Sequence, residues 1–377
     1  MKHTLDRKLM SKGKRVALTI LGVVGSIVIV ATLAVAGYVG YLFLTYDRIG
    51  DVELEVTQNS NIAQIQIGTE YSAVSYNIGF GAYSQDYTFF LDTGYGNDGN
   101  PTCGYWSKAR SKEAVEFNTN GAISAVASLN PDFVTFQEVD TNSTRSYQIN
   151  QDGLIENAFP AYSKTHAVNF HSAFLPYPLY DMHGSVNAGL TTLSRFQIQD
   201  AHRHSYTVSD GVSKFFDLDR CFSSQRIHVS NGKDLYIVNF HMSAYDEGGT
   251  IRTQQVAEMN AFLNECGNRG DYVIVGGDFN HDLLTFDPDY QYNATDHRAF
   301  NMTKKFPDWV HFYFSEDGNS PLPTGYTLVA SDNVPACRNN DIEYSPSESF
   351  VCVIEGVVRD NDLQNRRRGF HKLPEGL

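Results

Sequence analysis

A short apolar run followed by two glycines and two oxygen-bearing side chains is the strongest chemical signal in this 377-residue sequence. Residues 273–275 precede Gly276 and Gly277, and the chain then presents Asp278 and Asn280 two positions apart. In an extended segment, residues i and i+2 point the same way, so the carboxylate and the amide would meet at one place. Such a pair can hold a metal-bound water and a phosphate oxygen, and the glycines would let the backbone approach a ligand. The alternative is an ordinary tight turn after a strand, where Asp and Asn are also frequent.

Three other polar residues stand at the ends of apolar runs that read as strands. Asn77 closes one such run, Glu138 follows residues 133–136, and His241 follows residues 236–240. Each residue alone has a structural explanation, as a polar cap at a strand end or as a hydrogen-bonded core histidine. A buried, unpaired carboxylate such as that of Glu138 would nevertheless be costly, and a divalent cation would remove that cost.

The types of these residues indicate which metal and which reaction they would serve. Asn77, Glu138, Asp278 and Asn280 carry oxygen donors, which select Mg²⁺, Mn²⁺ or Ca²⁺ over zinc. A hard cation that polarises a phosphoryl oxygen, with His241 for proton transfer, would hydrolyse a phosphoester. The sequence therefore predicts a phosphoesterase whose preferred cofactor is Mg²⁺.

The elements that must position these side chains alternate between short apolar runs and helix-like segments. Helices are expected over residues 111–129 and 251–266, where apolar side chains recur at helical spacing. Many strands with few helices indicate one α/β domain with layered sheets rather than an all-parallel barrel. Residues 81–110, rich in glycine and aromatic side chains, read as a long insertion. Strands are expected over residues 71–78, 132–136, 190–193, 223–229, 235–240, 272–275 and 350–358.

The N-terminal region has the pattern of a membrane anchor. Residues 1–15 carry a net charge of +5, and residues 16–46 then run for 31 positions without a charged side chain. About 20 apolar residues suffice to cross a bilayer, and a cleaved signal peptide has a shorter apolar core of about 7–15. The basic flank belongs on the cytoplasmic side, so the remainder of the chain would lie outside the cytoplasm, held at the cell membrane by a single pass. We therefore predict a cytoplasmic tail (1–15), a transmembrane helix (16–46), a linker (47–69) and a catalytic domain (70–377).

The charge of the chain bears on its substrate. Removing the +5 of residues 1–15 from the chain total of −14 leaves −19 for residues 16–377. A domain this acidic lacks the cationic surface that releases counterions from nucleic-acid backbones. A lipid headgroup or a small phosphodiester is therefore favoured as the substrate over nucleic acid. The aromatic stretch 170–180 reads either as a lipid contact or as a packed loop, and nothing indicates a protein partner.

The cysteines leave the redox chemistry open. Five are present, an odd number, and none has the CxxC or Cys/His spacing of a zinc site. Disulfides are permitted outside the cytoplasm, where the domain is expected to lie. Cys337 and Cys352 flank a loop, and they form either a disulfide or two unlinked thiols.

In their order along the chain, the motifs resemble those of the endonuclease/exonuclease/phosphatase superfamily, which has the deoxyribonuclease I-like fold. The resemblance extends over roughly residues 70–360 and rests on five segments. They are Ser-Tyr-Asn-Ile (75–78), Gln-Glu-Val (137–139), Gly-Leu-Thr-Thr-Leu-Ser-Arg (189–195), Asn-Phe-His-Met-Ser-Ala (239–244) and Gly-Gly-Asp-Phe-Asn (276–280).

This resemblance implies a four-layered α/β/β/α sandwich with the site at the top of two facing sheets. It implies that Glu138 is the principal metal ligand and that Asn77 lies close to the metal and the phosphate. Asp278 would orient the attacking water, Asn280 would bind the scissile phosphate, and His241 would donate to the phosphate or the leaving oxygen. The reaction would be in-line hydrolysis of a phosphoester, with the metal neutralising charge at phosphorus.

The C-terminal region departs from the family pattern. Family members end with a strand that carries an Asp-His pair, whose histidine acts on the attacking water. Here Glu355, a further catalytic candidate, stands where the preceding strand usually has Asp, and no Asp-His dipeptide follows it. His371 lies in a basic tail without a strand pattern. We therefore expect that the last strand is missing and that activity is weak; the alternative is a non-catalytic member that acts as a binding module.

Overall fold

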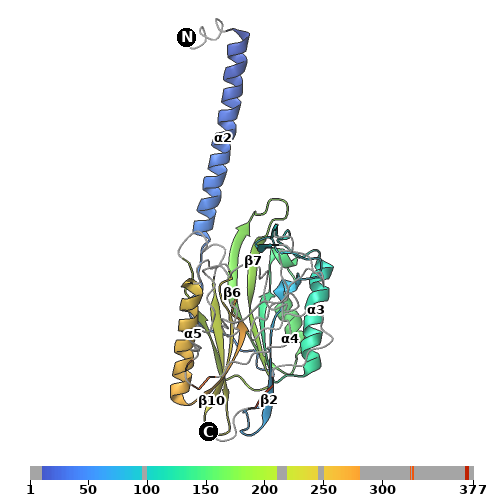
Figure 1. The fold of residues 1–377 in the computed structure, drawn as a ribbon, viewed down its shortest axis with the longest axis vertical. Coiled ribbons are helices and arrows are strands. Elements are labelled where there is room, and N and C mark those ends of the chain that lie inside the picture. The colour runs from blue at the N-terminus through green and yellow to red at the C-terminus, as the bar shows by residue number, and fades with distance from the viewer. Residues whose placement is uncertain are drawn as a thin grey trace. The chain divides into compact units, whose positions relative to one another are not determined.

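The chain forms two compact units, residues 1–47 and residues 48–377, in the computed structural model of this protein. Within the residues described, the first unit consists of one helix, and the second contains β-sheets flanked by helices (Figure 1). The structure describes residues 11–95, 100–209, 219–244, 250–280, 323, 325–326 and 370–372.

Helix α2 (Lys12–Leu44) makes up the described part of the first unit. Its N-terminus is capped by Ser11, whose hydroxyl accepts a hydrogen bond from the Lys14 amide at 3.4 Å. At roughly 1.5 Å per residue its 33 residues extend about 50 Å, and none of them is buried. The helix is long and apolar enough to cross a membrane, and it spans residues 12–44 instead of the expected 16–46. Three hydroxyls inside it donate to carbonyl oxygens four residues earlier; they belong to Thr19, Ser26 and Thr32.

The second unit contains two five-stranded sheets and one small hairpin. In the first sheet the order is β1 (Val52–Glu53), β8 (Asp200–Ser205), β9 (Cys221–His228), β10 (Asp234–His241) and β11 (Tyr272–Asp278). In the second it is β12 (Phe370–Lys372), β2 (Glu70–Asn77), β5 (Phe133–Asp140), β7 (Gly184–Ser194) and β6 (Ser163–Leu175). The hairpin, in the predicted insertion, consists of β3 (Thr93–Tyr95) and β4 (Pro101–Cys103).

The two sheets pack face to face, and helices cover their outer faces (Figure 1). Helix α5 (Thr250–Arg269) packs on the first sheet through Met259 and Leu263. Helices α3 (Lys112–Leu129) and α4 (Gln151–Ala158) pack on the second sheet through a separate apolar cluster. The order of the layers is α/β/β/α, which confirms the predicted four-layered fold.

Parallel pairing brings the chemically important strand ends to one end of this sandwich. In the second sheet, β2 runs parallel to β5, with Asn77 opposite Gln137. In the first sheet, β10 runs parallel to β11, with His241 opposite Asp278. The side chains of Asn77 and Asp278 are hydrogen-bonded across the sandwich, so the two sets of strand ends face each other. We call this end, which carries Asn77, His241 and Asp278, the site end.

Residues 47–69 differ from the linker expected from the sequence. Strand β1 pairs with β8, and single bridges at Thr57, Ile62 and Ile65 join the segment to residues in or next to both sheets. Ile65 is fully buried in the core between the sheets. Apolar residues scattered among polar ones give no strand periodicity, so the pattern did not indicate that this segment packs against the sandwich.

Several elements were not expected from the sequence. They include β6, β8 and α4, whose mixed polar and apolar residues or short lengths give weak patterns. Strand β12 is another, because no strand was expected around His371; it pairs antiparallel with β2 and places His371 opposite Tyr71, away from the site end. Three residues of backbone pairing leave no recognisable pattern in the sequence. The expected strand 350–358 lies outside the described residues.

The paired glycines of β11 serve the packing of the sandwich. A Cβ atom on Gly276 would lie 2.7 Å from the Thr135 hydroxyl of the facing sheet, and one on Gly277 would lie 2.3 Å from the Phe240 carbonyl oxygen. The sequence had suggested close approach to a ligand instead. The close approach is to neighbouring strands, and it lets the end of β11 lie against the second sheet.

We therefore expect Gly277→Ala to lower the free energy of unfolding by about 1–3 kcal/mol, because the added methyl group meets a backbone oxygen that cannot move alone. Gly121→Ala is the matched control, since Gly121 lies inside α3 with nothing within 4 Å of a Cβ. That change should raise stability by about 0.5–1 kcal/mol. Urea unfolding followed by circular dichroism measures both, and equal effects of the same sign would contradict this account.

Candidate active site

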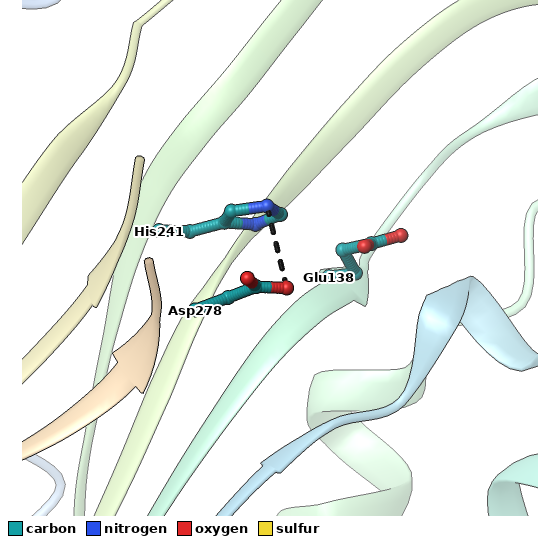
Figure 2. Close-up of side chains that lie close together, drawn as sticks. All are labelled: Glu138, His241 and Asp278. Carbon is teal, nitrogen blue, oxygen red and sulfur yellow. Dashed lines mark ion pairs between the residues drawn. The ribbon is translucent and has the colours of Figure 1, made fainter. Parts of the chain in front are cut away.

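Four of the predicted site residues converge at the site end. Asn77 ends β2, Glu138 lies near the end of β5, His241 ends β10 and Asp278 ends β11. Ligand atoms of Glu138, His241 and Asp278 all lie within 4.8 Å of one another, although they come from different strands (Figure 2). Glu355, the remaining predicted residue besides Asn280, lies outside the described residues.

Asn77 holds the two carboxylates through a single amide group. Its Nδ2 donates to Glu138 Oε1 at 2.7 Å and to Asp278 Oδ2 at 2.8 Å, which uses one N–H for each carboxylate. Its Oδ1 accepts a hydrogen bond from the Gly79 amide at 2.9 Å. Asn77 is 2% exposed and Asp278 1% exposed, so these bonds replace water around buried polar groups.

His241 and Asn280 lie near different oxygens of the Asp278 carboxylate. His241 Nε2 lies 3.9 Å from Asp278 Oδ2, and the Asn280 amide donates to Asp278 Oδ1 at 2.9 Å. Asn280 has a φ of 50°, and its side-chain Nδ2 donates to the Met242 carbonyl oxygen at 2.9 Å. The strand does not extend to Asn280, so the same-face geometry expected for Asp278 and Asn280 does not apply. Asn280 instead joins the loop after β10 to the end of β11.

Glu138 owes its orientation to an irregularity in β5. The pairing of β5 with β7 changes register between Phe136 and Val139, and Glu138 within that interval has a φ of 53°. A bulge of this kind re-aims a side chain that an ideal strand would direct elsewhere, at some cost in backbone strain. The sequence indicated a strand-end carboxylate, but nothing in it indicated the bulge.

A buried amide network joins the two sheets next to this cluster, and sequence reasoning missed it. Gln137 Nε2 donates to Asn239 Oδ1 at 2.7 Å. Asn239 Nδ2 lies within hydrogen-bonding distance of the Phe136 carbonyl oxygen at 3.1 Å, the Thr191 carbonyl oxygen at 3.2 Å and the Thr192 hydroxyl at 3.1 Å. Gln137 and Asn239 are fully buried. Their signal in the sequence was their position inside the two motifs that contain Glu138 and His241.

Arg145 is a second residue that sequence reasoning missed. It forms a bidentate ion pair with Asp140, with Nε at 3.0 Å and Nη2 at 2.8 Å from the two carboxylate oxygens. Burial lowers the pKa of Arg145, but the Asp140 carboxylate outweighs this and raises it, and Glu138 adds in the same direction. The guanidinium lies 4.0 Å from the centre of the Phe80 ring. A permanent positive charge thus stands close enough to Glu138 to interact with its carboxylate.

The predicted insertion forms a packed aromatic wall in this region. Phe80, Tyr87 and Phe89 are buried in one cluster with Val115 of α3. Next to it, His183 contacts the rings of Phe89 and Phe90, and its Nδ1 lies 2.8 Å from the Ser107 carbonyl oxygen. Burial, reinforced by the Arg145 charge, lowers the pKa of His183 to about 3, so this imidazole is neutral at physiological pH.

Among the described residues the cysteines are free thiols. Cys103 is exposed, whereas Cys221 and Cys266 are buried. Burial raises the pKa of both buried thiols to about 11, so neither is a reactive thiolate at neutral pH. Cys337 and Cys352 lie outside the described residues.

Replacing Asn77 by alanine removes the hydrogen-bond donor that the two facing carboxylates share, and should therefore lower the stability of the fold. With EDTA present at pH 7, we expect Asn77→Ala to lower the free energy of unfolding by about 1–3 kcal/mol, because Asp278 loses a buried donor. Urea unfolding measures this loss. Asn120→Ala, at an exposed position of α3, is the control, and an equal loss there would contradict the role of Asn77.

This chain matches one protein-family model and is similar to several solved structures. The family model described as Endonuclease/Exonuclease/phosphatase family matches residues 74–337, whereas the search of curated proteins finds no match. Similar solved structures include TDP2 from Caenorhabditis elegans, with 16% identity, a TM-score of 0.37 and coverage of 59% of this chain and 52% of that chain. The human Nocturnin catalytic domain has 16% identity and a TM-score of 0.37, with coverage of 61% of this chain and 68% of that chain. Sphingomyelinase C from Streptomyces griseocarneus has 16% identity and a TM-score of 0.34, with coverage of 58% of this chain and 66% of that chain.

The chain thus spans between about half and two thirds of the length of the solved chains that it resembles. Likeness at these identities, with TM-scores below 0.5, says nothing of the reaction that this chain performs. The family model is different, because it covers more than half of the sequence and includes every convergent residue described above. The chain belongs to the endonuclease/exonuclease/phosphatase family.

Proposed function

We propose that this chain is a membrane-anchored phosphoesterase that hydrolyses a phosphodiester or phosphomonoester with the help of Mg²⁺. The observation that carries the proposal is the convergence of Glu138, His241 and Asp278 within 4.8 Å at the ends of strands from both sheets. Carboxylates this close together, one of them buried, disfavour each other's charge, and a divalent cation relieves that cost. The family match supports the class of reaction.

The donor set fits a hard divalent cation. Glu138 is half-buried and offers a carboxylate next to the carboxylate of Asp278, and oxygen ligands of this kind suit Mg²⁺, with Mn²⁺ or Ca²⁺ as alternatives. We assign Glu138 as the principal ligand. Asn77 would lie close to the ion, and its Nδ2 holds both carboxylates in place. When bound, the ion would supply the charge that polarises the phosphoryl oxygen.

The roles proposed for the other residues follow from their placement. Asp278 Oδ2 would accept a proton from the attacking water and hold that water in line with phosphorus. His241, with Nε2 facing the same carboxylate, would donate to a phosphate oxygen or to the leaving oxygen. Asn280 would bind the scissile phosphate, which requires its Nδ2 to exchange the Met242 carbonyl oxygen for the substrate. Glu355, in the C-terminal region, is kept as a further catalytic candidate, at the position whose counterpart in the family orients a histidine.

The proposed location and substrate rest on charge. The basic residues among positions 1–15 favour a cytoplasmic N-terminus, which would place residues 48–377 on the other side of the cell membrane. The net charge of −19 over residues 16–377 favours a lipid headgroup or a small phosphodiester over nucleic acid.

Metal binding can be tested apart from turnover. Mg²⁺ at about 100 times its dissociation constant should stabilise the wild-type fold by about 2.7 kcal/mol. Glu138→Gln should abolish that stabilisation, because a neutral amide is a much weaker ligand than a carboxylate. Asp278→Asn should reduce turnover more than metal affinity. Thermal unfolding with and without Mg²⁺ measures the effect.

The control is Glu265→Gln, at an exposed position of α5, which should respond to Mg²⁺ as the wild type does. Equal shifts in the melting temperature of wild type and Glu138→Gln would refute this metal site. Mg²⁺ binding without turnover on any phosphoester would favour the alternative function, a binding module of the same fold.

The orientation predicts a simple outcome for intact cells. Protease added from outside should digest residues 48–377 and spare the N-terminal residues, because only the former would be exposed to the medium. Detection with tags at the two ends of the chain reads out each part. Protection of the C-terminal tag, with digestion of the N-terminal one, would reverse the proposed orientation.

A further inference from the structure

An exposed apolar surface lies at the turn that joins β6 to β7. On the surfaces of most soluble proteins, large apolar side chains are scattered singly, but here several gather on one turn and one neighbouring loop. Three of them, Leu179, Tyr177 and Tyr180, are 77%, 62% and 60% exposed. We call this surface the aromatic tip; its members are Tyr105, Phe174, Tyr177, Leu179, Tyr180 and Met182.

The tip is a built structure whose single acidic group is turned inward. Tyr180 stacks on Tyr105 with ring centres 4.7 Å apart and donates to the Tyr105 carbonyl oxygen at 3.0 Å. Asp181 accepts hydrogen bonds from the Ser107 and Lys108 amides, at 2.9 and 3.2 Å, and pairs with Lys108 Nζ at 3.0 Å. The surface that the tip presents is therefore apolar and tyrosine-rich, without net charge.

The tip projects from the same end of the sandwich as the candidate active site. Asp140, two residues after Glu138, pairs with Ala188 of β7, and the hairpin continues to the pair Leu175–Gly184 (Figure 1). The four steps along β7 from Ala188 to Gly184 correspond to about 14 Å at roughly 3.4 Å per residue. The tip thus extends beyond the plane of the Glu138 carboxylate, on the side from which substrate would arrive.

The segment that connects to α2 enters the second unit at this same end. Ser205, Cys221, His241 and Asp278 form one row across four paired strands. The carboxylate of Asp51 accepts hydrogen bonds from Ser205 at the end of that row, from its amide at 2.7 Å and its hydroxyl at 2.6 Å. Strand β1 then runs antiparallel to β8, so the chain comes in at the site end and runs away from it.

Arg203, which is 1% exposed, fixes this entry point. Its Nη1 donates to the carbonyl oxygens of Ile49 and Gly50, both at 2.7 Å, and its Nη2 donates to the Asp219 carbonyl oxygen at 2.6 Å. The Asp219 carboxylate in turn accepts from the Ile49 amide at 2.9 Å. Between the last residue of α2 and the first residue of the second unit only residues 45–47 intervene, and this stretch reaches at most about 15 Å.

We propose that the aromatic tip docks on the bilayer that α2 crosses, and that the site end acts on phosphoesters of lipids presented at that bilayer surface. This inference rests on the proposed function, since it takes α2 as a membrane anchor and the site as a phosphoesterase. Because only residues 45–47 separate α2 from the second unit, a bilayer crossed by α2 would lie near the end at which the chain enters. Tyrosine and leucine side chains favour the interface between headgroups and acyl chains. Docking is apolar rather than electrostatic, because the tip has no net charge and the unit around it is acidic.

Photo-crosslinking in a membrane tests the docking without reference to activity. The full chain, with p-benzoylphenylalanine in place of Leu179, is reconstituted into phosphatidylcholine vesicles that contain an alkyne-tagged phosphatidylcholine. We expect the tag to be transferred to the protein on irradiation. The same probe in place of Asn231, an exposed residue between β9 and β10 at the opposite end of the sandwich, should give no tagged protein.

The crosslink at position 179 should persist when the ionic strength is raised to about 0.5 M, because apolar contacts are not screened by salt. Crosslinking from position 179 to another part of the chain, or to a second copy, with no lipid tag would overturn the proposal. Equal lipid tagging from positions 179 and 231 would overturn it as well.

Hydrolysis assays on two substrates provide a second, independent test. In the double variant Leu179→Ser and Tyr180→Ser, hydrolysis of phospholipid in the vesicles should fall about tenfold or more, because apolar contacts with the bilayer are lost. Hydrolysis of the soluble diester bis(p-nitrophenyl) phosphate should be unchanged. An equal loss on both substrates, or no loss on the lipid, would refute docking. Absence of turnover by the wild type on both substrates would refute the proposed function, and the crosslink would still decide the docking.

Discussion

The shared amide of Asn77 is the interaction on which the candidate site depends. It bonds to a carboxylate from each sheet, Glu138 on one side and Asp278 on the other, so it fixes the distance between two like charges that would otherwise separate. This arrangement requires the sheets to lie close together at one end. The glycines of β11 permit that approach, and the bond between Gln137 and Asn239 ties the sheets together directly beside it.

Backbone pairing, hydrogen bonds and an ion pair hold the residues around the carboxylates in place. Glu138 is directed by a bulge and stands close to the buried pair of Arg145 and Asp140, and Asn280 ties β11 to the loop after β10. Such fixed dipoles and charges suit a reaction in which negative charge develops on a phosphate, because they need no rearrangement as the charge grows. Backbone strain at Glu138 is tolerated because the surrounding pairing determines its conformation.

The segment that leads into the second unit, residues 48–51, constrains the direction in which the chain enters that unit. Arg203 binds backbone carbonyl oxygens of the incoming chain, so the direction in which the chain enters is set by the same sheet that carries His241 and Asp278. The aromatic tip projects from that end as well. A fold whose site, entry segment and apolar tip share one end is compatible with work on a surface, which is the basis of the inference drawn above.

The sequence by itself determined the layered α/β fold and the residues Asn77, Glu138, His241 and Asp278, because apolar runs that end in polar side chains are local features that survive without knowledge of packing. Only the tertiary structure decided how these residues meet: the bulge that turns Glu138, the shared amide of Asn77 and the departure of Asn280 from the strand. The packing of residues 47–69 also depended on the assembled sheets. Contacts between segments far apart in the chain leave no periodic pattern in the sequence, so they can be identified only in the folded structure.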